Sequence, residues 1–292
     1  MSKYDDIFKQ NIKDILAVPK WVPSRAQWDD GTVAKTKHVF GLVNRYDLRK
    51  EIPVGTLRRF YYKNSIDEML WIYSKKSNNI KDLGSHIWDQ WADANGSIGA
   101  AYGWQVANKL TKVRDRKPLP NGYTTCTVFL DQMDTVLSKL RNNPFDRRIM
   151  IMLYSPAEEN LMGLAPCCYS CTFNVTIDEN GDKVLNMLLN QRSQDMIVAN
   201  NWNVFQYSVL LIMVATEVGM IPGELVHVIA DAHIYDRHEE IAKHLLELES
   251  HDAPKLTIAG VGYKSFYEFT KDDFILDNYV YSEEIKNIPV AK

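Results

Sequence analysis

The stretch Leu164-Ala-Pro-Cys-Cys-Tyr-Ser-Cys-Thr-Phe173 decides the fold, because it joins a rigid chain entry to an alternating apolar run. Pro166 fixes its own φ and pushes the residue before it towards extended geometry. We therefore expect Cys167 to be the first residue of a strand, with its thiol at the mouth of a cleft. Strict alternation would place Cys167, Tyr169 and Cys171 on one face of that strand.

A thiol in this position could act as a nucleophile. The thiolate is the reactive form, and a nearby positive charge should lower the pKa of the thiol. Gln191-Arg192-Ser193-Gln194-Asp195 offers such a charge. On residue type alone, a buried cysteine is more often an inert small hydrophobe. Zinc is not expected, because no second Cys/His pair lies at ligand spacing from Cys167 and Cys171.

Size and composition set the class of protein. The chain has 292 residues, 46% of them apolar, and a net charge of −3. This suits a large α/β core and gives no overall basic field that would require nucleic acid. Three of the four cysteines are crowded at 167–171, which favours a reducing cytoplasm over a disulfide framework. The charged start and short apolar runs predict neither a secretion signal nor a membrane span.

Periodicity and turn signals predict the secondary structure. Helices are expected over residues 5–17, 65–73, 123–140, 202–218 and 239–248, and strands over residues 39–47, 149–154, 172–178, 183–190 and 224–229. Asn180-Gly181 predicts a hairpin between two of these strands. Residues 22–36 are polar and turn-rich, so they predict a flexible loop on which Arg25 could close over an anion.

Several single residues have both a structural and a functional interpretation. Glu68 beside an apolar helix face is either solvated at its edge or held in a site with a raised pKa. Trp88 and Trp91 can be core or a platform for a stacked ring. Arg147 and Arg148 are adjacent at a strand entry, so they would point to opposite faces.

Two later segments complete the set of candidates. Asn203 lies in the first turn of the apolar helix, facing whatever lies at its head. If residues 231–235 are extended, alternation places His233 and Tyr235 on one face. The spacing of His233 and His238 suits neither a strand face nor a helical pair, so a metal pair is rejected.

These pieces, in this order, resemble the thymidylate synthase family over about residues 22–291. The matching motifs are Asp67-Glu-Met-Leu-Trp71, Ile87-Trp-Asp-Gln-Trp-Ala-Asp93, Tyr102-Gly103, Asp146-Arg-Arg148, Ala165-Pro-Cys167, Gln191-Arg-Ser-Gln-Asp195, Asn203, His233-Ile-Tyr235 and Pro289-Val-Ala291. The resemblance implies a single α/β (α+β) domain over residues 1–292, with a large mixed sheet flanked by helices. Residues 1–21 would be a helical extension and residues 286–292 a closing tail.

The same resemblance implies a homodimer, packed through the sheet, that converts dUMP to dTMP. 5,10-Methylenetetrahydrofolate would supply both the carbon and the hydride, with no metal, membrane or required nucleic acid. Cys167 would attack C6 of uracil, because C5 is a poor nucleophile until thiolate addition makes it an enolate carbon.

Site roles follow from the resemblance residue by residue. Phosphate would be bound by Arg192 and Ser193, by Arg147 and Arg148 of the second subunit, and by Arg25. Asn203 would bind uracil N3–H and O4, and His233 and Tyr235 would bind the deoxyribose 3′-hydroxyl. The folate would be bound by Trp88, Trp91, Asp195, Arg58 and the tail around Ala291, and proton transfers would involve Glu68 and Tyr102. Arginine suits phosphate because its planar fork donates two hydrogen bonds.

This chain departs from the family pattern in four places. Cys168 stands where a histidine usually follows the nucleophile, and Ala199 replaces a usual glycine. The loop before Val39 lacks the common Arg-Thr-Gly-Thr, so Arg25 is the nearest phosphate arginine. Lys292 ends the chain where an apolar residue is commoner.

Two rival functions use the same residues. A pyrimidine hydroxymethylase on this scaffold would complete the transferred carbon with water in place of hydride. Asn203 speaks against a cytosine substrate, since the cytosine amino group calls for an acceptor such as Asp, but it does not exclude dUMP hydroxymethylation. A catalytically silent nucleotide- or RNA-binding relative would keep the arginines without a working thiol.

Overall fold

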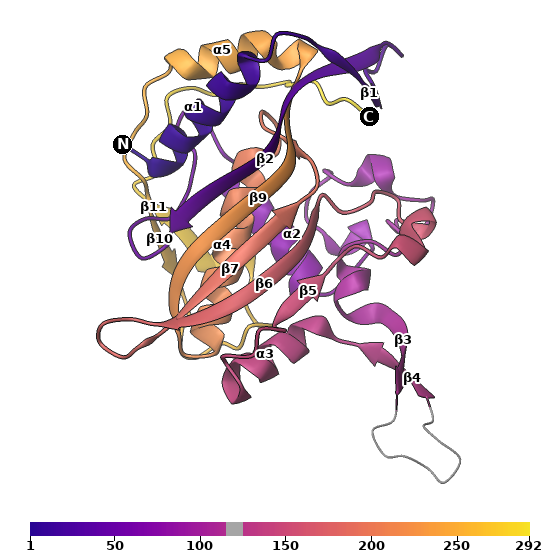
Figure 1. Cartoon of the computed structure of the whole chain (residues 1–292), viewed down its shortest axis with the longest axis vertical. Coiled ribbons are helices and arrows are strands. Elements are labelled where there is room, and N and C mark those ends of the chain that lie inside the picture. Colours follow the sequence, from indigo (N-terminus) through magenta and orange to yellow (C-terminus); the bar gives the residue numbers. More distant parts are fainter. Residues whose placement is uncertain (115–124) are drawn as a thin grey trace.

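The computed structural model describes residues 1–114 and 125–292 (Figure 1). Its α-helices are α1 (Lys3–Leu16), α2 (Tyr62–Tyr73), α3 (Gln132–Asn142), α4 (Asn200–Glu217) and α5 (Glu239–Glu247). Its strands are β1 (Val22–Gln27), β2 (Val33–Asp47), β3 (Lys109–Arg114), β4 (Thr125–Leu130), β5 (Met150–Met152), β6 (Cys168–Ile177), β7 (Lys183–Gln191), β8 (Gln194–Asp195), β9 (Ile221–Tyr235), β10 (Lys255–Ile258) and β11 (Phe274–Asp277).

A seven-stranded mixed sheet forms the centre of the fold, in the order β1-β2-β9-β7-β6-β5, with β8 pairing β9 (Figure 1). β7 and β8 run parallel to β9, and the other neighbours are antiparallel. The hairpin predicted at Asn180-Gly181 is confirmed: β6 and β7 flank it, and Gly181 has a φ of 88°. The parallel β7–β9 pair brings Gln191, the residue at which the motif begins, beside the strand that carries His233.

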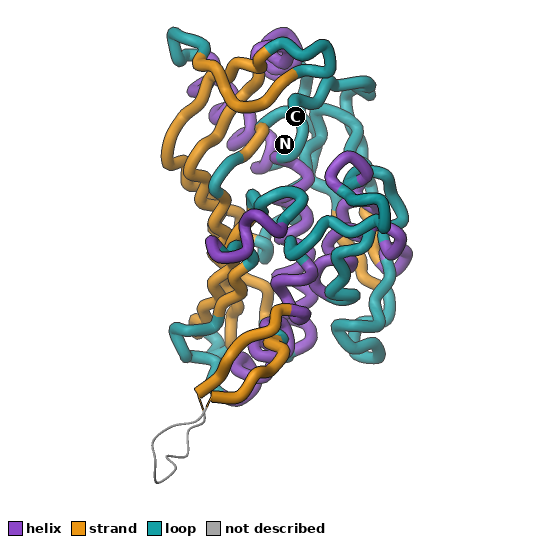
Figure 2. Tube along the Cα trace, turned by 90° about the vertical axis from the view of Figure 1, so that its right-hand side faces the viewer, coloured by secondary structure: helices purple, strands orange, loops and turns teal. Residues whose placement is uncertain are grey.

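Helices and loops lie mostly on one side of this sheet, and the other side is bare (Figure 2). α4 contacts β7, β9 and α2, and is buried nearly all round, as its apolar composition predicts. Buried and partly exposed positions alternate over residues 187–190 of β7 and 225–229 of β9, so His227 and Leu189 face the helices while Val226 and Leu188 face away. In the part of the chain that is described, no helix is long and apolar enough to cross a membrane.

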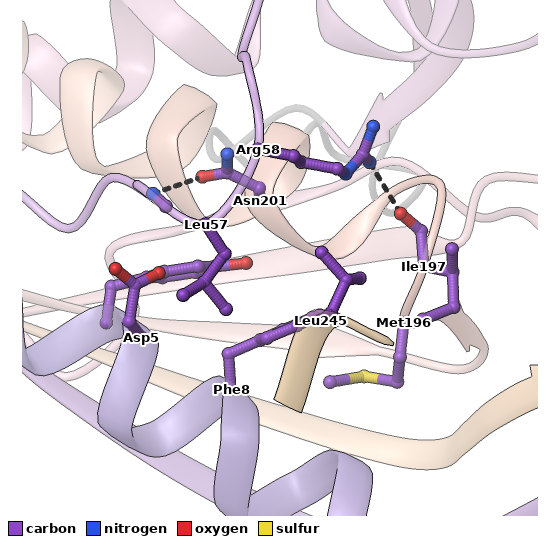
Figure 3. Close-up of a pocket in the computed structure, with 10 residues that line it drawn as sticks. Asp5, Phe8, Leu57, Arg58, Met196, Ile197, Asn201 and Leu245 are labelled. Carbon is purple, nitrogen blue, oxygen red and sulfur yellow. Dashed lines mark hydrogen bonds between the residues drawn. The ribbon is translucent and has the colours of Figure 1, made fainter. Parts of the chain in front are cut away.

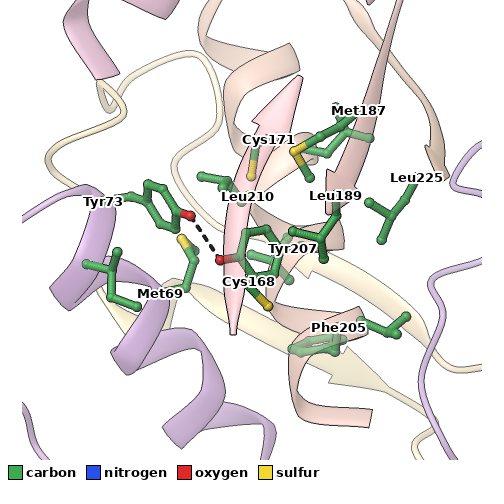
Figure 4. Close-up of a cluster of buried hydrophobic side chains, with 14 of the residues drawn as sticks. Met69, Tyr73, Cys168, Cys171, Met187, Leu189, Phe205, Tyr207, Leu210 and Leu225 are labelled. Atoms are coloured by element: carbon green, nitrogen blue, oxygen red, sulfur yellow. Dashed lines mark hydrogen bonds between the residues drawn. The ribbon is translucent and has the colours of Figure 1, made fainter. Parts of the chain in front are cut away.

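Cys168 and Cys171 both lie in the core between the sheet and the helices, near the hydrogen-bonded hydroxyls of Tyr73 and Tyr207 (Figure 4). The prediction of Cys167, Tyr169 and Cys171 on one face is therefore wrong. The pairing shifts between Cys168 and Ser170, so two steps on β6 match one on β7. Such a bulge reverses the alternation. β6 also begins at Cys168, one residue later than expected.

The segment predicted as a flexible loop is a strand pair at the sheet edge. β1 carries Arg25 and pairs with β2, which itself begins at Val33, six residues before the predicted start. Most β1 side chains are exposed. An edge strand with few buried positions has no apolar alternation to reveal it, which explains the error.

Two other predictions need correction. The helical stripe over residues 123–140 divides into β4 and α3, and Phe129 lies on β4 with 70% of its surface exposed; residues 123–124 lie outside the described part. The apolar run at 149–154 forms only the short edge strand β5, where Met150 and Met152 are exposed and Ile151 is buried.

α1 is fixed to the body of the protein by a buried carboxylate. Asp5 is fully buried and accepts hydrogen bonds from the Thr56 amide (3.1 Å), the Thr56 hydroxyl (2.5 Å) and the Ser250 hydroxyl (2.8 Å). Three segments far apart in sequence therefore meet on one side chain.

We expect Asp5→Ala to lower the free energy of unfolding by about 2–3 kcal/mol, because it leaves buried hydrogen-bond donors without an acceptor. Urea denaturation measures this change. Asp6→Ala is the matched control, since Asp6 is an exposed carboxylate in the same helical turn. Equal effects of the two substitutions would contradict the anchoring role of Asp5.

Candidate active site

Cys167 is held by backbone contacts immediately before β6. Its amide donates to the Tyr102 hydroxyl (3.3 Å), and its carbonyl accepts from the Arg192 amide (2.9 Å). Its side chain is partly exposed, whereas Cys168 is buried. The chain entry set by Pro166 thus leaves one thiol partly exposed and sends the next into the core.

The Arg192 guanidinium is clamped beside this thiol. Its Nη2 donates to the Ala165 carbonyl (2.7 Å) and its Nε donates to the Pro166 carbonyl (3.1 Å). Nη2 also lies 3.7 Å from Cys167 Sγ. The two motifs that the sequence suggested, 25 residues apart, are therefore brought together by direct contact.

Burial outweighs these charges at Cys167. Removal from water raises the pKa of the thiol above its ordinary value, while Arg192 and Arg25 act in the opposite direction. The guanidinium groups thus lower the pKa of the thiol as expected, but the net shift in the protein without ligands is upward. Desolvation disfavours the thiolate more than two guanidinium groups favour it.

Glu68 is buried in a cage of donors and is not solvated at the helix edge. Its carboxylate accepts from Trp88 Nε1 (2.5 Å), Trp202 Nε1 (2.5 Å) and Gln206 Nε2 (2.8 Å). Burial raises the pKa of Glu68, and the three donors oppose the rise. A buried carboxyl group with a raised pKa is a candidate for proton transfer.

Aromatic rings connect Glu68 to the thiol. The Trp88 ring lies 5.0 Å from that of Tyr102 and 5.2 Å from that of Trp91. Trp88 is buried and Trp91 is partly exposed. Tyr102 has a φ of 44°, and burial holds the pKa of its hydroxyl well above the ordinary value. Trp91 is therefore the tryptophan of this pair with more surface available to a ligand.

Asn203 projects from the first turn of α4. Its Oδ1 accepts a hydrogen bond from Gln191 Nε2 (3.2 Å). Gln191 Nε2 also donates to the Ser193 carbonyl (3.0 Å), so the base-facing and phosphate-facing candidates share one neighbour.

His233 and Tyr235 lie on one face of β9, as predicted, with ring centroids 5.0 Å apart. Asp231 Oδ1 lies 2.8 Å from His233 Nδ1 and accepts its hydrogen bond. Burial first, and then the Asp195 and Cys167 charges, raise the pKa of Tyr235 to about 12, while Arg25 opposes the rise. Arg25 is thus close enough to act on both Tyr235 and Cys167.

Asp195 shapes the loop between β8 and α4. Its Oδ1 accepts from the Ile197 amide (2.9 Å) and the Val198 amide (3.0 Å). Arg58 approaches the same loop and donates to the Ile197 carbonyl (2.6 Å; Figure 3). Burial lowers the pKa of Arg58, with Asp195 among the groups that oppose this.

The C-terminal tail is docked over this region. His238 Nε2 lies 2.7 Å from the Pro289 carbonyl and donates to it. Lys292 and Gln27 exchange two backbone hydrogen bonds (2.6 and 2.8 Å), and Lys292 Nζ lies 2.9 Å from Asp29. Ala291 is held between these contacts. Arg58 and tail residues 285–288 line a cleft of about 370 Å³.

Arg147 and Arg148 are not part of this cluster. Both are exposed just before β5, and Arg148 donates to Asp146 of its own turn (2.9 Å). Among the described residues, neither has a hydrogen bond or ion pair with Cys167 or Arg192. One chain therefore supplies Arg192, with Arg25 nearby, but not the paired arginines.

The structure adds residues that the sequence did not single out. Trp202 and Gln206 cage Glu68, Gln191 contacts both Asn203 and His227, and His238 anchors the tail. The signal for Trp202 and Gln206 was their spacing on one face of α4. No group of residues that could hold a metal ion occurs in ranges 1–114 and 125–292.

The comparisons with known proteins agree with this arrangement. The family model described as thymidylate synthase matches residues 6–291. "Thymidylate synthase 1" of Bacillus subtilis (strain 168) is 38% identical over 292 residues, covering 98% of each chain. "Thymidylate synthase" of Bacillus phage phi3T is 37% identical with the same coverage.

A solved structure is similar over the whole chain. It is the thermostable thymidylate synthase A from Bacillus subtilis, with a TM-score of 0.86 and 36% identity, and each chain is covered completely. With the family model matching nearly end to end, the chain belongs to the thymidylate synthase family.

Proposed function

We propose that this enzyme converts dUMP to dTMP with 5,10-methylenetetrahydrofolate as the donor of carbon and hydride, releasing dihydrofolate. The observation that carries the proposal is the Arg192 guanidinium clamped 3.7 Å from the Cys167 thiol. The thiolate adds to C6 of uracil, and the resulting enolate carbon at C5 attacks the methylene group of the folate. Loss of the C5 proton and hydride transfer then release the thiolate and complete the methyl group.

The nucleotide would lie along the edge formed by the ends of β6, β7 and β9. Arg192, Ser193 and Arg25 would bind its phosphate, and His233 and Tyr235 would bind the 3′-hydroxyl. Asn203 would read N3–H and O4 of uracil. Phosphate binding would hold the nucleotide so that C6 of uracil lies against the Cys167 sulfur, and attack would be favoured by this proximity.

The folate would enter from the tail side. Trp91 and Trp88 offer aromatic surface, Asp195 offers carboxylate oxygen to the pterin ring, and Arg58 offers charge to the acidic end. Glu68 would manage protons at O4 through water, and Tyr102 would assist removal of the C5 proton. The tail around Ala291 would close over both ligands. No metal takes part in this scheme.

A homodimer would complete the phosphate site. The bare side of the sheet carries apolar residues near its centre, with Val43 54% exposed and Val226, Val228 and Leu188 partly exposed. A sheet face that stays in water normally carries polar residues, so a second copy is expected to cover this one. Arg147 and Arg148 would then reach the partner's site. The whole would act in the cytoplasm as one domain per chain.

We expect Cys167→Ala to abolish dTMP formation while dUMP binding stays within a few-fold of wild type, because the arginines remain. Tritium release from [5-³H]dUMP measures C5 attack, and calorimetry measures binding. The absorbance of dihydrofolate in the wild type decides between hydride and water: its absence during turnover would indicate a hydroxymethylase. Retained turnover in the variant would refute the role of Cys167, and a binding-only protein would release no tritium in either form.

The raised pKa of Cys167 predicts slow alkylation without ligands. The pKa of the thiol in the folded protein lies above its ordinary value. The rate of alkylation by iodoacetamide should therefore still be rising at pH values above that ordinary value. Arg192→Met should raise the pKa further and slow alkylation at pH 8 several-fold. Arg49→Met is the control, because Arg49 pairs with Asp47 on the surface. Mass spectrometry of the Cys167 peptide gives the rate; equal rates in the two variants would contradict the electrostatic link.

Shared sites predict complementation between two inactive variants. Cys167→Ala and the double variant Arg147→Glu/Arg148→Glu should each be inactive as homodimers. Co-refolding should give mixed dimers in which one of the two sites is intact. At random pairing about half of the dimers are mixed, so about a quarter of the wild-type activity should return. Failure of the mixture to recover any activity, with mixed dimers present by native mass spectrometry, would refute arginine donation across the interface.

A further inference from the structure

Behind Asn203, side chains from three elements form a hydrogen-bonded chain. His227 on β9 contacts Gln191 at the end of β7, with 2.7 Å between His227 Nε2 and Gln191 Oε1. Gln191 Nε2 in turn donates to Asn203 Oδ1 on α4 (3.2 Å). His227 is fully buried and Gln191 is 2% exposed. Figure 1 shows β7 and β9 side by side, with α4 behind them.

The direction of every bond in this chain is determined by one backbone carbonyl. The Ser193 carbonyl can only accept, so the group of Gln191 that lies 3.0 Å from it must be the NH2 group. The Gln191 Oε1 therefore faces His227, and His227 Nε2 must carry the proton. The second hydrogen of the Gln191 NH2 group is then available to Asn203, which must present its oxygen.

The position of Asn44 is compatible with this tautomer of His227. Asn44 lies directly opposite His227 on β2, and both side chains are on the buried side of the sheet. Within the described residues, Asn44 Nδ2 and His227 Nδ1 have no hydrogen-bond partner. With the proton on Nε2, they are a donor and an acceptor on neighbouring strands. A proton on Nδ1 would place two donors there.

His227 stays neutral in this position. Burial lowers its pKa to about 3, so its single donor persists at any pH near neutral. An apolar residue could fill the same buried space without leaving a ring nitrogen unpaired. Space filling alone therefore does not account for an imidazole at this position.

We propose that His227 is a positioning residue that sets the base preference of the enzyme by fixing the amide orientation of Asn203 through Gln191. With Oδ1 turned to Gln191, a second lone pair of Oδ1 is left for uracil N3–H, and Nδ2 is left for O4. The reversed amide would donate to N3 and accept from an amino group, which is the pattern of cytosine. This inference rests on the proposed function.

A pair of variants with similar shape tests the chain. His227→Gln keeps an NH donor where the imidazole has Nε2, and His227→Met removes it. Calorimetry with dUMP and dCMP gives the preference of each variant as a ratio of Kd values. We expect His227→Met to lose roughly tenfold of the preference, the size of one displaced hydrogen bond, and His227→Gln to keep most of it. In turnover, the loss should appear in KM for dUMP more than in kcat.

Two further measurements keep the test decisive. Gln191→Met breaks the hydrogen-bonded chain at its middle and should lose the same preference. It therefore tests the chain even if His227→Met does not fold. Nitrogen NMR of the wild-type imidazole should show the Nε2–H tautomer without titration between pH 5 and 8. His244→Met is the control, since His244 is an exposed histidine on α5 paired with Glu283.

The outcomes separate the two proposals. A folded His227→Met with an unchanged ratio, or an Nδ1–H tautomer in the wild type, would overturn the role of His227. A wild-type enzyme that does not prefer dUMP over dCMP would instead refute the proposed function.

Discussion

The site depends on the clamp between Arg192 and the turn that precedes β6. One arginine donates from its amide to the Cys167 carbonyl and from its guanidinium to the carbonyls of Ala165 and Pro166. These bonds align the thiol and the cation as one rigid unit. Because a guanidinium is always charged and planar, it can satisfy two carbonyls and still present a face to an anion. Other site residues are placed relative to this unit by the β7–β9 register.

Desolvation disfavours the charged forms of two groups in the site. Burial raises the pKa of Cys167 and of Glu68, although each has polar neighbours that act in the opposite direction. Burial therefore sets the direction of both pKa shifts, and the polar neighbours only reduce them. Any group that replaces water beside Cys167 or Glu68 changes this balance.

Much of the fold and site could be predicted from the sequence because the decisive segments have strong local signals. The β6–β7 hairpin follows from Asn180-Gly181, and α4 follows from its long apolar run. What failed depends on contacts that no local pattern contains. β1 is an exposed edge strand without alternation, and the bulge at Cys168–Ser170 reverses the faces of β6. The net pKa of Cys167 required the actual burial of its sulfur.

Gln191 shows why the residues around a motif matter as much as its charged members. The motif suggested anion binding through Arg192 and Ser193, but the glutamine that opens it points the opposite way, into the core. Alternation at the strand end makes this unavoidable, since neighbours on a strand face opposite sides. One side chain thereby ties the backbone of Ser193 to Asn203 and to His227. If His227 positions Asn203 as we propose, a change of hydrogen-bond donor deep in the sheet would alter the base preference through groups that do not themselves meet the ligand.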